Sequence, residues 1–297
     1  MSNIIENTVF IINPHSGKQK YAKLVKKIRG IAGEDARIFI SGNVQQFDDF
    51  IRDNIDNFKY FVIAGGDGTV NGMAQHLFGK KDKVLAVIPR GSGNGFAREL
   101  GFNTSLKNLF TALQQGDSLD IDVLELNGKK FINAAGLGFD SCVAHEFANM
   151  KSRGLKTYIR AAIQCLKKFN NFNAEIVVEG TTISDKFKMI TFANTRQFGN
   201  NAIIAPKAHP ADGKMDIVLV KPMPSYVYPD FAMKIMTGKI KDSKYVSLLQ
   251  TGKNIKITTD FNIIHIDGEP AQMPSSSQLN IYKGMLKVLK MKPAIPG

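Results

Sequence analysis

The sequence predicts two domains, an α/β domain with a parallel-rich sheet followed by an antiparallel β-sandwich. Three observations carry this prediction. The chain has 297 residues, which is roughly two average domains in length. Strand-like and helix-like patterns alternate up to about residue 122. Beyond that point strand-like runs dominate, and turn signals separate them.

The first part of the chain repeats an apolar run of strand length followed by a segment with helical periodicity. This alternation is typical of an open sheet of mostly parallel strands covered by helices. The runs are almost wholly apolar, as expected of strands buried on both faces. The expected strands are residues 8–13, 36–41, 60–64 and 84–89, and the expected helices are 21–31, 45–54, 69–78 and 94–100.

The second part contains short apolar runs separated by pairs such as Asn127-Gly128 and Asp212-Gly213. Such pairs favour hairpin turns and therefore an antiparallel sandwich. The predicted α/β domain is 1–122, to which a tail at 287–297 could return, and the predicted sandwich is 123–286. The expected strands are 123–126, 131–135, 174–179, 189–193, 215–220, 254–259, 263–267, 278–282 and 286–289.

One expected helix, 151–169, interrupts the series of strands. It combines an apolar stripe at helical spacing with basic residues at most other positions. Two interpretations stay open: a basic amphipathic helix on an anionic membrane, or a surface helix whose stripe packs on the core. The stripe is Leu155, Ile159, Ile163 and Leu166, and the basic residues are Lys151, Arg153, Lys156, Arg160, Lys167 and Lys168.

The formal net charge of +13 suits a polyanionic partner, which can be nucleic acid, an anionic membrane or nucleotide phosphate. No basic stripe with interleaved aromatic residues supports nucleic acid, so we do not expect that partner. The only two cysteines, Cys142 and Cys165, favour a reducing compartment over a disulfide framework. No signal peptide or apolar stretch of about 20 residues is evident. We therefore expect a cytoplasmic protein.

Three loops rich in small residues, 13–17, 65–69 and 89–98, each follow a predicted strand. In open α/β sheets ligands bind at the carboxyl ends of strands, and such loops leave backbone amides accessible to phosphate. The first and third loops are compatible with plain turns, and Asn94 is expected to be the N-cap of the following helix. None of the three matches a Walker A or dinucleotide-binding pattern.

The loop at 65–69 is the most informative, because three glycines around one acid cost backbone entropy in a plain turn. Asp67 can interact with Mg²⁺ or with an attacking hydroxyl, and Thr69 and Asn71 add donors near a helix N-terminus. A fourth segment, Asp267-Gly268-Glu269, places two acids around a glycine. A tight turn with solvated acids explains that segment equally well.

Together and in this order, the four segments resemble the diacylglycerol kinase catalytic-domain superfamily, which includes bacterial lipid kinases, sphingosine kinases and ceramide kinases. The resemblance extends from Asn13 to Glu269 and implies a phosphofructokinase-like α/β domain, a β-sandwich domain, and an active site in the cleft between them. The matching pieces are N-P-x-S-G from Asn13, G-G-D-G-T-V-N from Gly65, P-x-G-S-G-N-x-F-A-R from Pro89 and D-G-E from Asp267.

The resemblance implies an ATP-dependent kinase that uses Mg²⁺, and it assigns roles to single residues. Glu269 would accept the proton of the lipid hydroxyl, with Asp267 and Asp67 supporting Mg²⁺–ATP. A second Mg²⁺ would bind the Asp212 side chain and the backbone carbonyls of His209 and Lys214. The nucleotide-binding residues would be Asn13, Pro14, His15, Ser16, Gly17, Ser41, Gly65, Gly66, Asp67, Gly68, Thr69, Val70, Asn71 and Ser92.

The acceptor stays open among diacylglycerol, sphingoid bases and related lipids. Bacterial diacylglycerol-kinase-like members often have threonine and aspartate where this chain has Ser92 and Gly95. The expected partner is a lipid at an anionic membrane surface, contacted peripherally, and a homodimer is left open. Two alternatives remain: a kinase of a soluble substrate that resembles NAD kinase, and a non-catalytic lipid or nucleotide sensor. The motif at 91–98 resembles lipid kinases and argues against the first alternative.

Overall fold

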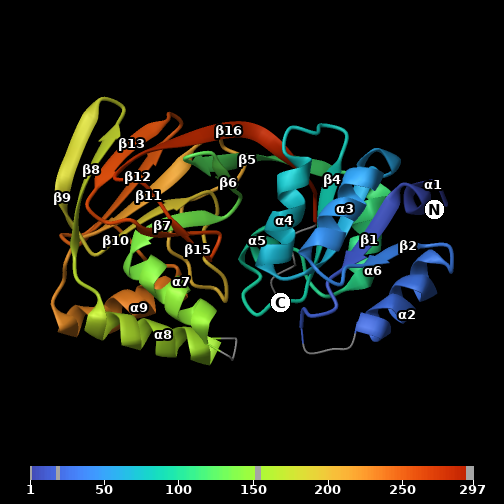
Figure 1. Ribbon diagram of the computed structural model, residues 1–297, viewed down its shortest axis with the longest axis horizontal. Coiled ribbons are helices and arrows are strands. Elements are labelled where there is room, and N and C mark those ends of the chain that lie inside the picture. The colour runs from blue at the N-terminus through green and yellow to red at the C-terminus, as the bar shows by residue number, and fades with distance from the viewer. Residues whose placement is uncertain (1, 18–20, 151–154, 292–297) are drawn as a thin grey trace. The chain divides into compact units, whose positions relative to one another are not determined.

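The computed structural model describes residues 2–17, 21–150 and 155–291 (Figure 1). Contacts divide the chain into two compact units, which are called unit 1 and unit 2 below. Unit 1 consists of Met1–Ile121 with Gly284–Gly297, and unit 2 consists of Asp122–Lys283. Two strands, β5 (Ser118–Leu126) and β16 (Ser276–Leu289), belong partly to each unit.

Unit 1 is built on a parallel sheet whose strands run in the order β2-β1-β3-β4. The end of β16 adds to this sheet beside β4, with Val288 opposite Leu85. The side chains of β1 and β3 are buried throughout, which explains why these runs are apolar at every position. The strands are β1 (Thr8–Ile12), β2 (Arg37–Ile40), β3 (Tyr60–Gly65) and β4 (Val84–Pro89).

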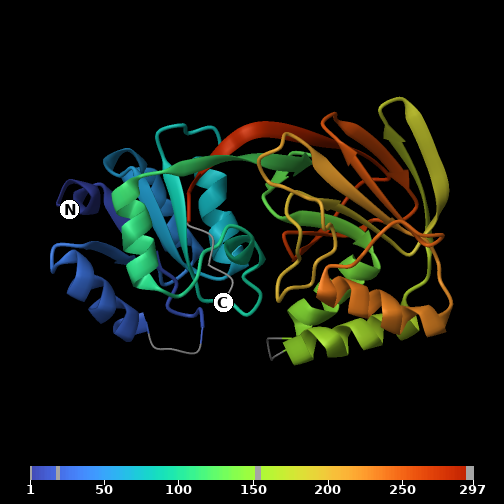
Figure 2. The ribbon, with the colours of Figure 1, turned by 180° about the vertical axis from the view of Figure 1, so that it is seen from behind.

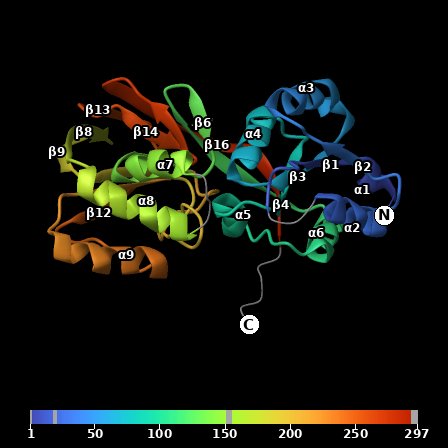
Figure 3. The same ribbon diagram turned by 60° about the horizontal axis from the view of Figure 1, so that its bottom comes forward.

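Helices cover both faces of this sheet, with α3 and α4 on one face and α2 and α6 on the other (Figure 3). This placement follows from right-handed crossovers between parallel strands when the chain first moves to β2 and then returns across β1 to β3. The helices are α1 (Ser2–Glu6), α2 (Tyr21–Ala32), α3 (Val44–Asn54), α4 (Asp67–Leu77), α5 (Gly95–Glu99) and α6 (Leu106–Gln115).

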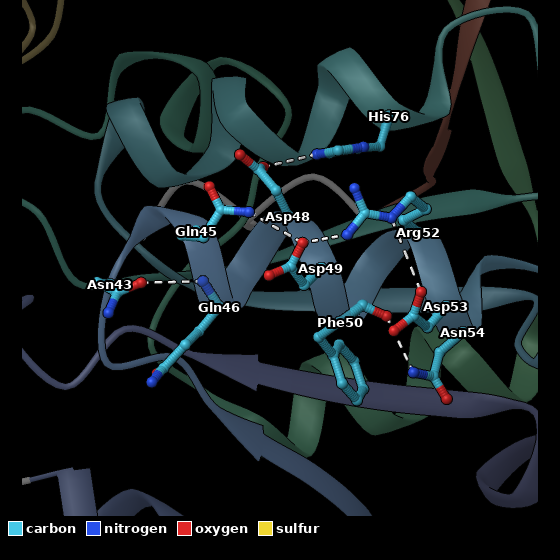
Figure 4. Close-up of polar contacts among 10 residues, drawn as sticks. All are labelled: Asn43, Gln45, Gln46, Asp48, Asp49, Phe50, Arg52, Asp53, Asn54 and His76. Carbon is cyan, nitrogen blue, oxygen red and sulfur yellow. Dashed lines mark hydrogen bonds and ion pairs between the residues drawn. The ribbon is translucent and has the colours of Figure 1, made fainter.

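Helix α3 supports α4, the helix that begins in the glycine loop at 65–69. Figure 4 shows the Asn43 side chain accepting a hydrogen bond from the Gln46 amide at 2.9 Å, which caps the start of α3. Further along the helix, Asp48 Oδ1 lies 2.9 Å from Nε2 of His76 near the end of α4 (Figure 4). The two helices are therefore joined by a polar contact as well as by packing.

Unit 2 is a sandwich of antiparallel sheets. One sheet has six strands in the order β12-β11-β10-β7-β14-β15, and the facing strands run β16-β13-β8-β9. The predicted fold class, an α/β domain with a parallel-rich sheet plus an antiparallel sandwich, is confirmed. The strands not yet given are β6 (Lys129–Phe131), β7 (Ala134–Gly138), β8 (Phe172–Val178), β9 (Thr181–Phe187), β10 (Met189–Ala193), β11 (Met215–Val220), β12 (Val246–Thr251), β13 (Ile255–Thr259), β14 (Ile263–Ile266) and β15 (Glu269–Gln272).

The core of unit 2 explains why β11 is apolar at nearly every position. Ile217 and Leu219 belong to the core between the sheets. Val218 and Val220 point to the other face, where they pack with residues of α9 (Tyr228–Thr237) such as Ile235. The six-stranded sheet is thus covered on both faces, one by the second sheet and one by helices.

Helices α7 (Phe139–Asn149) and α8 (Leu155–Lys168) pack against each other in unit 2. Cys142 of α7 and Cys165 of α8 form a disulfide with their Cα atoms 6.0 Å apart. This pairing corrects the expectation drawn from the cysteine count. The sequence separation of 23 residues could not reveal it, because α7 was not predicted and the two thiols meet only when the helices fold against each other.

Three expectations about elements of the second part were wrong. The run 131–135 is not one strand but the end of β6 and the start of β7, and the break lies where backbone amides bind the Asp267 side chain. The runs 278–282 and 286–289 are one strand, β16, which continues through Gly284. The helix at 151–169 is accompanied by α7 and α9, and its first residues, 151–154, lie outside the described part.

Candidate functional site

The three loops of unit 1 contact one another at the carboxyl ends of β1, β3 and β4. The backbone amide of Asn13 donates to the Ala64 carbonyl at 3.0 Å, and that of Arg90 donates to the Gly65 carbonyl at 2.9 Å. The Arg90 side chain reaches the first loop, where Nε donates to the Ser16 carbonyl at 3.0 Å. Residues far apart in sequence are therefore held in one small region of unit 1.

Glycine is required where these loops approach most closely. A Cβ atom on Gly91 would lie 2.7 Å from the Gly66 Cα atom, so neither loop can carry a side chain there. Gly17 has a φ of +82°, and a Cβ atom on it would lie 2.9 Å from the Arg90 carbonyl oxygen. These contacts explain the glycine positions by backbone packing as well as by any ligand.

The amino end of α4 is open toward its loop. Gly66 is the N-cap and has no side chain with which to satisfy the first turn, and the first intrahelical bond runs from the Val70 amide to the Gly66 carbonyl at 3.1 Å. The amides of Gly68 and Thr69 have no hydrogen-bond partner among the residues that the structure describes. Exposed first-turn amides and the helix dipole form an anion-binding site.

Side chains around this helix end are pre-arranged. Asn13 Nδ2 donates to Thr69 Oγ1 at 3.0 Å, and Asn13 Oδ1 accepts from the His15 amide at 2.9 Å. Thr69 is itself tightly packed, because a Cβ atom on Gly65 would lie 2.5 Å from its Cβ atom. The first two loops are thus fixed to each other through Asn13 and Thr69.

Asp67 joins the second loop to the third. Its carboxylate accepts hydrogen bonds from the backbone amides of Asn94, Gly95 and Phe96, at the start of α5. Burial raises the pKa of the Asp67 carboxyl above its usual value, and these hydrogen bonds oppose the shift only in part. Asp67, which is predicted to support Mg²⁺–ATP, therefore also caps helix α5.

Asn94 stands at the N-cap position of α5, as expected, but it does not act as the expected cap. Its backbone is left-handed, with a φ of 51°, and its side chain makes no bond to the first turn of the helix. Instead Oδ1 accepts from the Gly91 amide at 2.8 Å and Nδ2 donates to the Gly91 carbonyl at 2.7 Å. Asn94 closes the turn while Asp67 caps the helix, and the neighbouring Ser92 is exposed.

The remaining residues of unit 1 that are predicted to bind nucleotide differ in how accessible their side chains are to a ligand. The Ser41 side chain is buried, and its hydroxyl donates to the Asn43 carbonyl at 2.8 Å. Val70 is buried in α4. Asn71 accepts a hydrogen bond from Gln75 at 2.7 Å on the same helix. Pro14 is half-buried. The part of this region best suited to bind an anion is the amino end of α4.

In unit 2, the two acids of the Asp-Gly-Glu segment have different surroundings. Asp267 has a left-handed backbone, with a φ of 49°, and its carboxylate accepts from the amides of Ile132, Asn133 and Ala134 at 2.9–3.0 Å. It anchors the turn between β6 and β7. Glu269 is exposed at the first position of β15, whereas Asp267 is half-buried.

The loop predicted to hold a second metal ion is organised by its own side chains. Asp212 Oδ1 accepts from the Lys214 amide at 3.0 Å, and His209 Nδ1 accepts from the Ala211 amide at 3.3 Å. The amide of Gly213 donates to Asp122 Oδ2 at 2.6 Å. Asp122 was not predicted to have a role here.

A second acid at this loop was also missed. Burial and the charge of Asp212 raise the pKa of Asp216 to about 6. The available signal was an acid inside a run, 215–220, that is otherwise apolar. A carboxyl whose ionisation is disfavoured by burial and by a neighbouring carboxylate suits a cation. However, no group of three or more His, Cys, Asp or Glu side chains that could hold a metal ion occurs in the described residues, so backbone carbonyls and water would have to complete the ligands.

Two family models together match most of the chain. The model described as the diacylglycerol kinase catalytic domain matches residues 7–126. The model described as the YegS C-terminal NAD kinase beta sandwich-like domain matches residues 133–290. The boundary between the two matches lies close to the division between unit 1 and unit 2.

Similar proteins carry related names. A protein of Shewanella frigidimarina named "Probable lipid kinase YegS-like" is 29% identical over 224 residues, covering 72% of this chain and 71% of that protein. A "Diacylglycerol kinase" of Mycobacterium tuberculosis is 31% identical over 205 residues, covering 66% of this chain and 63% of that protein.

Solved structures share the fold. A structure described as a diacylglycerol kinase from Bacillus anthracis has a TM-score of 0.76 and 21% identity, and covers 98% of each chain. A yeast NADH kinase complexed with NADH has a TM-score of 0.51 and 11% identity, and covers 96% of this chain and 84% of that one. At these identities the likeness establishes the fold alone.

Proposed function

This chain belongs to the diacylglycerol kinase catalytic-domain family, and on that premise we propose that it transfers the γ-phosphoryl group of ATP to the hydroxyl of a membrane lipid. The two family models bear out the resemblance seen in the sequence motifs, and membership makes the chain a phosphotransferase. The observation that carries the proposal is the open amino end of α4, next to three loops that contact one another.

The phosphate-binding role is supported by the geometry of unit 1. The amides of Gly68 and Thr69 point out of α4 without a described partner, and phosphate is the anion that such helix ends bind best. Ser92 and the loop at 13–17 lie in the neighbouring loops and would add donors. Phosphoryl transfer needs alignment and neutralised charge more than covalent help from the protein, which suits a site made of backbone amides.

Mg²⁺ belongs to the proposal through carboxylates and carbonyls of this chain. Asp67 would support Mg²⁺–ATP, and Asp212 with the carbonyls of His209 and Lys214 would hold a second ion, close to Asp216. When bound, the cation neutralises charge on the phosphates. Both assignments agree with the oxygen donors that Mg²⁺ prefers.

In the proposed reaction the lipid hydroxyl oxygen forms a bond to the γ-phosphorus, the bond to the bridging oxygen of ADP breaks, and the hydroxyl proton moves to a carboxylate. Glu269 is our candidate for that acceptor because it is exposed, whereas Asp267 is occupied by three backbone amides. Asp267 would then act as a positioning residue that fixes the turn from which β15 begins.

The acceptor lipid and its location complete the proposal. The net charge of +13 supports contact with an anionic membrane surface, and peripheral contact suffices for a lipid substrate. None of the helices in the described residues has the length and hydropathy needed to span a bilayer. Nucleic acid is not proposed as a partner, and a homodimer stays a prediction.

A panel of acceptors tests the proposed function. The protein is incubated with Mg²⁺, ATP labelled at the γ-phosphate, and in turn diacylglycerol, a sphingoid base, ceramide and NAD. We expect label in one of the lipids and none in NAD. Label in NAD would favour the soluble-substrate alternative, which is supported by the fold that this chain shares with an NADH kinase. Nucleotide binding without label in any lipid would favour the non-catalytic sensor.

A further inference from the structure

Helix α8 carries two isoleucines on the side that faces solvent. The side chains of Ile159 and Ile163 are 49% and 52% exposed, whereas Ala161 and Cys165 are fully buried. Residues four apart share a helix face, and residues two apart lie on roughly opposite sides. The two isoleucines are thus stacked together on the solvent side of α8, so this part of the apolar stripe does not pack on the core.

A second set of exposed apolar side chains lies on α9 and on the 3₁₀ turn η2 (Ser225–Val227) before it. Tyr226, Met233 and Met236 are 78%, 63% and 43% exposed. A spacing of three residues places Met233 and Met236 on one side of α9. Phe231 and Ile235 on the other side pack against the six-stranded sheet, so the exposed set is not needed to hold α9 in place.

The two sets lie on neighbouring helices of unit 2. Helices α8 and α9 lie side by side in the views of Figures 1, 2 and 3. They are joined through Lys188, whose Nζ donates to the Phe169 carbonyl at 2.9 Å just after α8. The same Nζ lies 5.1 Å from the Phe169 ring centre and 6.0 Å from that of Tyr228 at the start of α9.

Exposed basic residues lie on α8 and follow α9 in the sequence. The sequence of α8 contains no acid, and its described basic side chains, Arg160 and Lys168, are exposed. After α9, three further lysines are exposed. The acid on α9, Asp230, is paired with Lys234 at 2.6 Å. Asp242, which stands among these lysines, accepts from the Leu248 amide at 2.8 Å. The lysines are Lys239, Lys241 and Lys244.

We propose that this face, termed the α8–α9 face, docks on an anionic lipid bilayer. Its apolar side chains would enter the boundary between headgroups and acyl chains, while its basic side chains contact the headgroups. A second copy of the chain is a poorer occupant, because a symmetric contact would bring the same basic residues against one another. The face consists of Ile159, Arg160, Ile163, Lys168, Tyr226, Met233, Met236, Lys239, Lys241 and Lys244.

The docking proposal rests on the proposed function only for its biological sense, because a lipid kinase must reach its substrate in the membrane. Physically it needs only the exposed apolar and basic side chains of this face. The two proposals can therefore fail separately.

The test measures binding of the full-length protein to vesicles by co-sedimentation. The vesicles contain phosphatidylcholine alone or mixed with phosphatidylglycerol. The variant Ile163→Glu with Met233→Glu places two negative charges on the α8–α9 face. The matched control, Ile31→Glu with Val44→Glu, places the same two charges at exposed apolar residues of unit 1, which are 41% and 75% exposed. Thermal melting shows that each variant is folded.

We expect the face variant to lose about tenfold or more of its affinity for anionic vesicles relative to the control, since each charge near an anionic leaflet counts for ~1 kcal/mol and 1.4 kcal/mol is tenfold. Binding should also fall with salt and with removal of phosphatidylglycerol. Equal loss in both variants, or a face variant that changes oligomeric state instead of vesicle binding, would overturn the proposal.

A second readout separates docking from catalysis. Phosphorylation of a short-chain acceptor lipid dispersed without vesicles should be the same in wild type and face variant. If no lipid is phosphorylated while the face variant still loses vesicle binding, the docking face stands and the proposed function fails. If phosphorylation is normal and both variants bind vesicles like wild type, the docking face is wrong and the proposed function stands.

Discussion

Asp67 shows how one residue can serve the fold and the proposed chemistry together. Its carboxylate receives three backbone amides at the start of α5, which are Asn94, Gly95 and Phe96. An alanine at this position would leave these amides without an acceptor and would confound a loss of activity with a loss of structure. Asparagine keeps one acceptor oxygen in place and removes the charge.

We predict that Asp67→Asn lowers the rate of phosphoryl transfer by ~10²–10⁴, the range for loss of a catalytic carboxylate, while thermal stability stays at or above that of the wild type. The reason for the second part is that burial, the largest influence on this carboxyl, raises its pKa and so penalises the ionised form. Steady-state kinetics and thermal melting at neutral pH measure both. A folded variant with full activity contradicts the assignment.

The pH dependence of stability tests the same environment. A carboxyl whose pKa is higher in the folded than in the unfolded state destabilises the fold when ionised. That penalty is complete above the folded-state pKa and is lost as the pH falls toward the unfolded value of about 3.9. We therefore predict that any stability advantage of Asp67→Asn shrinks as the pH is lowered through this range. Denaturant unfolding at a series of pH values would show a constant or growing advantage if this is wrong.

The Asp-Gly-Glu segment offers a contrast between neighbours. Asp267→Ala should lower the free energy of unfolding by about 1–3 kcal/mol, because it leaves buried amides of the β6–β7 turn without their acceptor. Glu269→Gln should leave stability near wild type, since the side chain is exposed, and should abolish most turnover. Urea unfolding and turnover are measured for both variants. Loss of stability in Glu269→Gln, or unchanged stability in Asp267→Ala, would contradict the prediction.

At the scale of elements, α7 and α8 form a pair whose contact includes the Cys142–Cys165 disulfide. This pair supports the α8–α9 face, because the buried side of α8 lies against α7. The chain-entropy model gives about 3 kcal/mol for a disulfide that closes a loop of this length.

We predict that a reductant lowers the free energy of unfolding of unit 2 by up to about 3 kcal/mol and does not affect a Cys142→Ser, Cys165→Ser variant. Thermal melting of both proteins with and without dithiothreitol measures the effect. A wild-type melting curve that does not respond to the reductant would show that the two thiols are not bonded in solution.

Some elements could be predicted closely from the sequence. The runs 189–193 and 215–220 match β10 and β11, because strands buried on both faces are continuous apolar runs with clear ends. Other elements could not. Strand β9 is exposed at most positions and lacks an apolar run, and α9 follows Pro222 and Pro224, residues that are typical of loops. The break between β6 and β7 depends on Asp267, which lies far away in sequence.

The candidate site, like the secondary structure, was predictable from the sequence only in part. The loops of unit 1 follow parallel strands, so their meeting at one edge of the sheet could be expected before the structure. The hydrogen bonds from α5 to Asp67 could not, because they depend on how the third loop turns back at Asn94. Asp122 was missed because an acid in a buried strand has no local motif, and Asp216 was missed although an acid in an otherwise apolar run was a signal.

At the scale of the whole molecule, we propose one unit that binds nucleotide and a second unit that carries a membrane-docking face. The net charge of +13 suits both proposed partners, since ATP and an anionic bilayer are both polyanions. Charge alone left these partners open together with nucleic acid. The family models place the chain in a kinase family, and the exposed isoleucines of α8 support the proposed contact with lipid.

The most direct test of the account is whether the γ-phosphate of ATP is transferred to a lipid. Labelled ATP, Mg²⁺ and vesicles of a total bacterial lipid extract are incubated with wild type and with Asp67→Asn, and the chloroform-soluble products are separated. We expect one labelled lipid with wild type and little labelled lipid with the variant. Label that is confined to water-soluble products, or equal lipid labelling by both proteins, would contradict it.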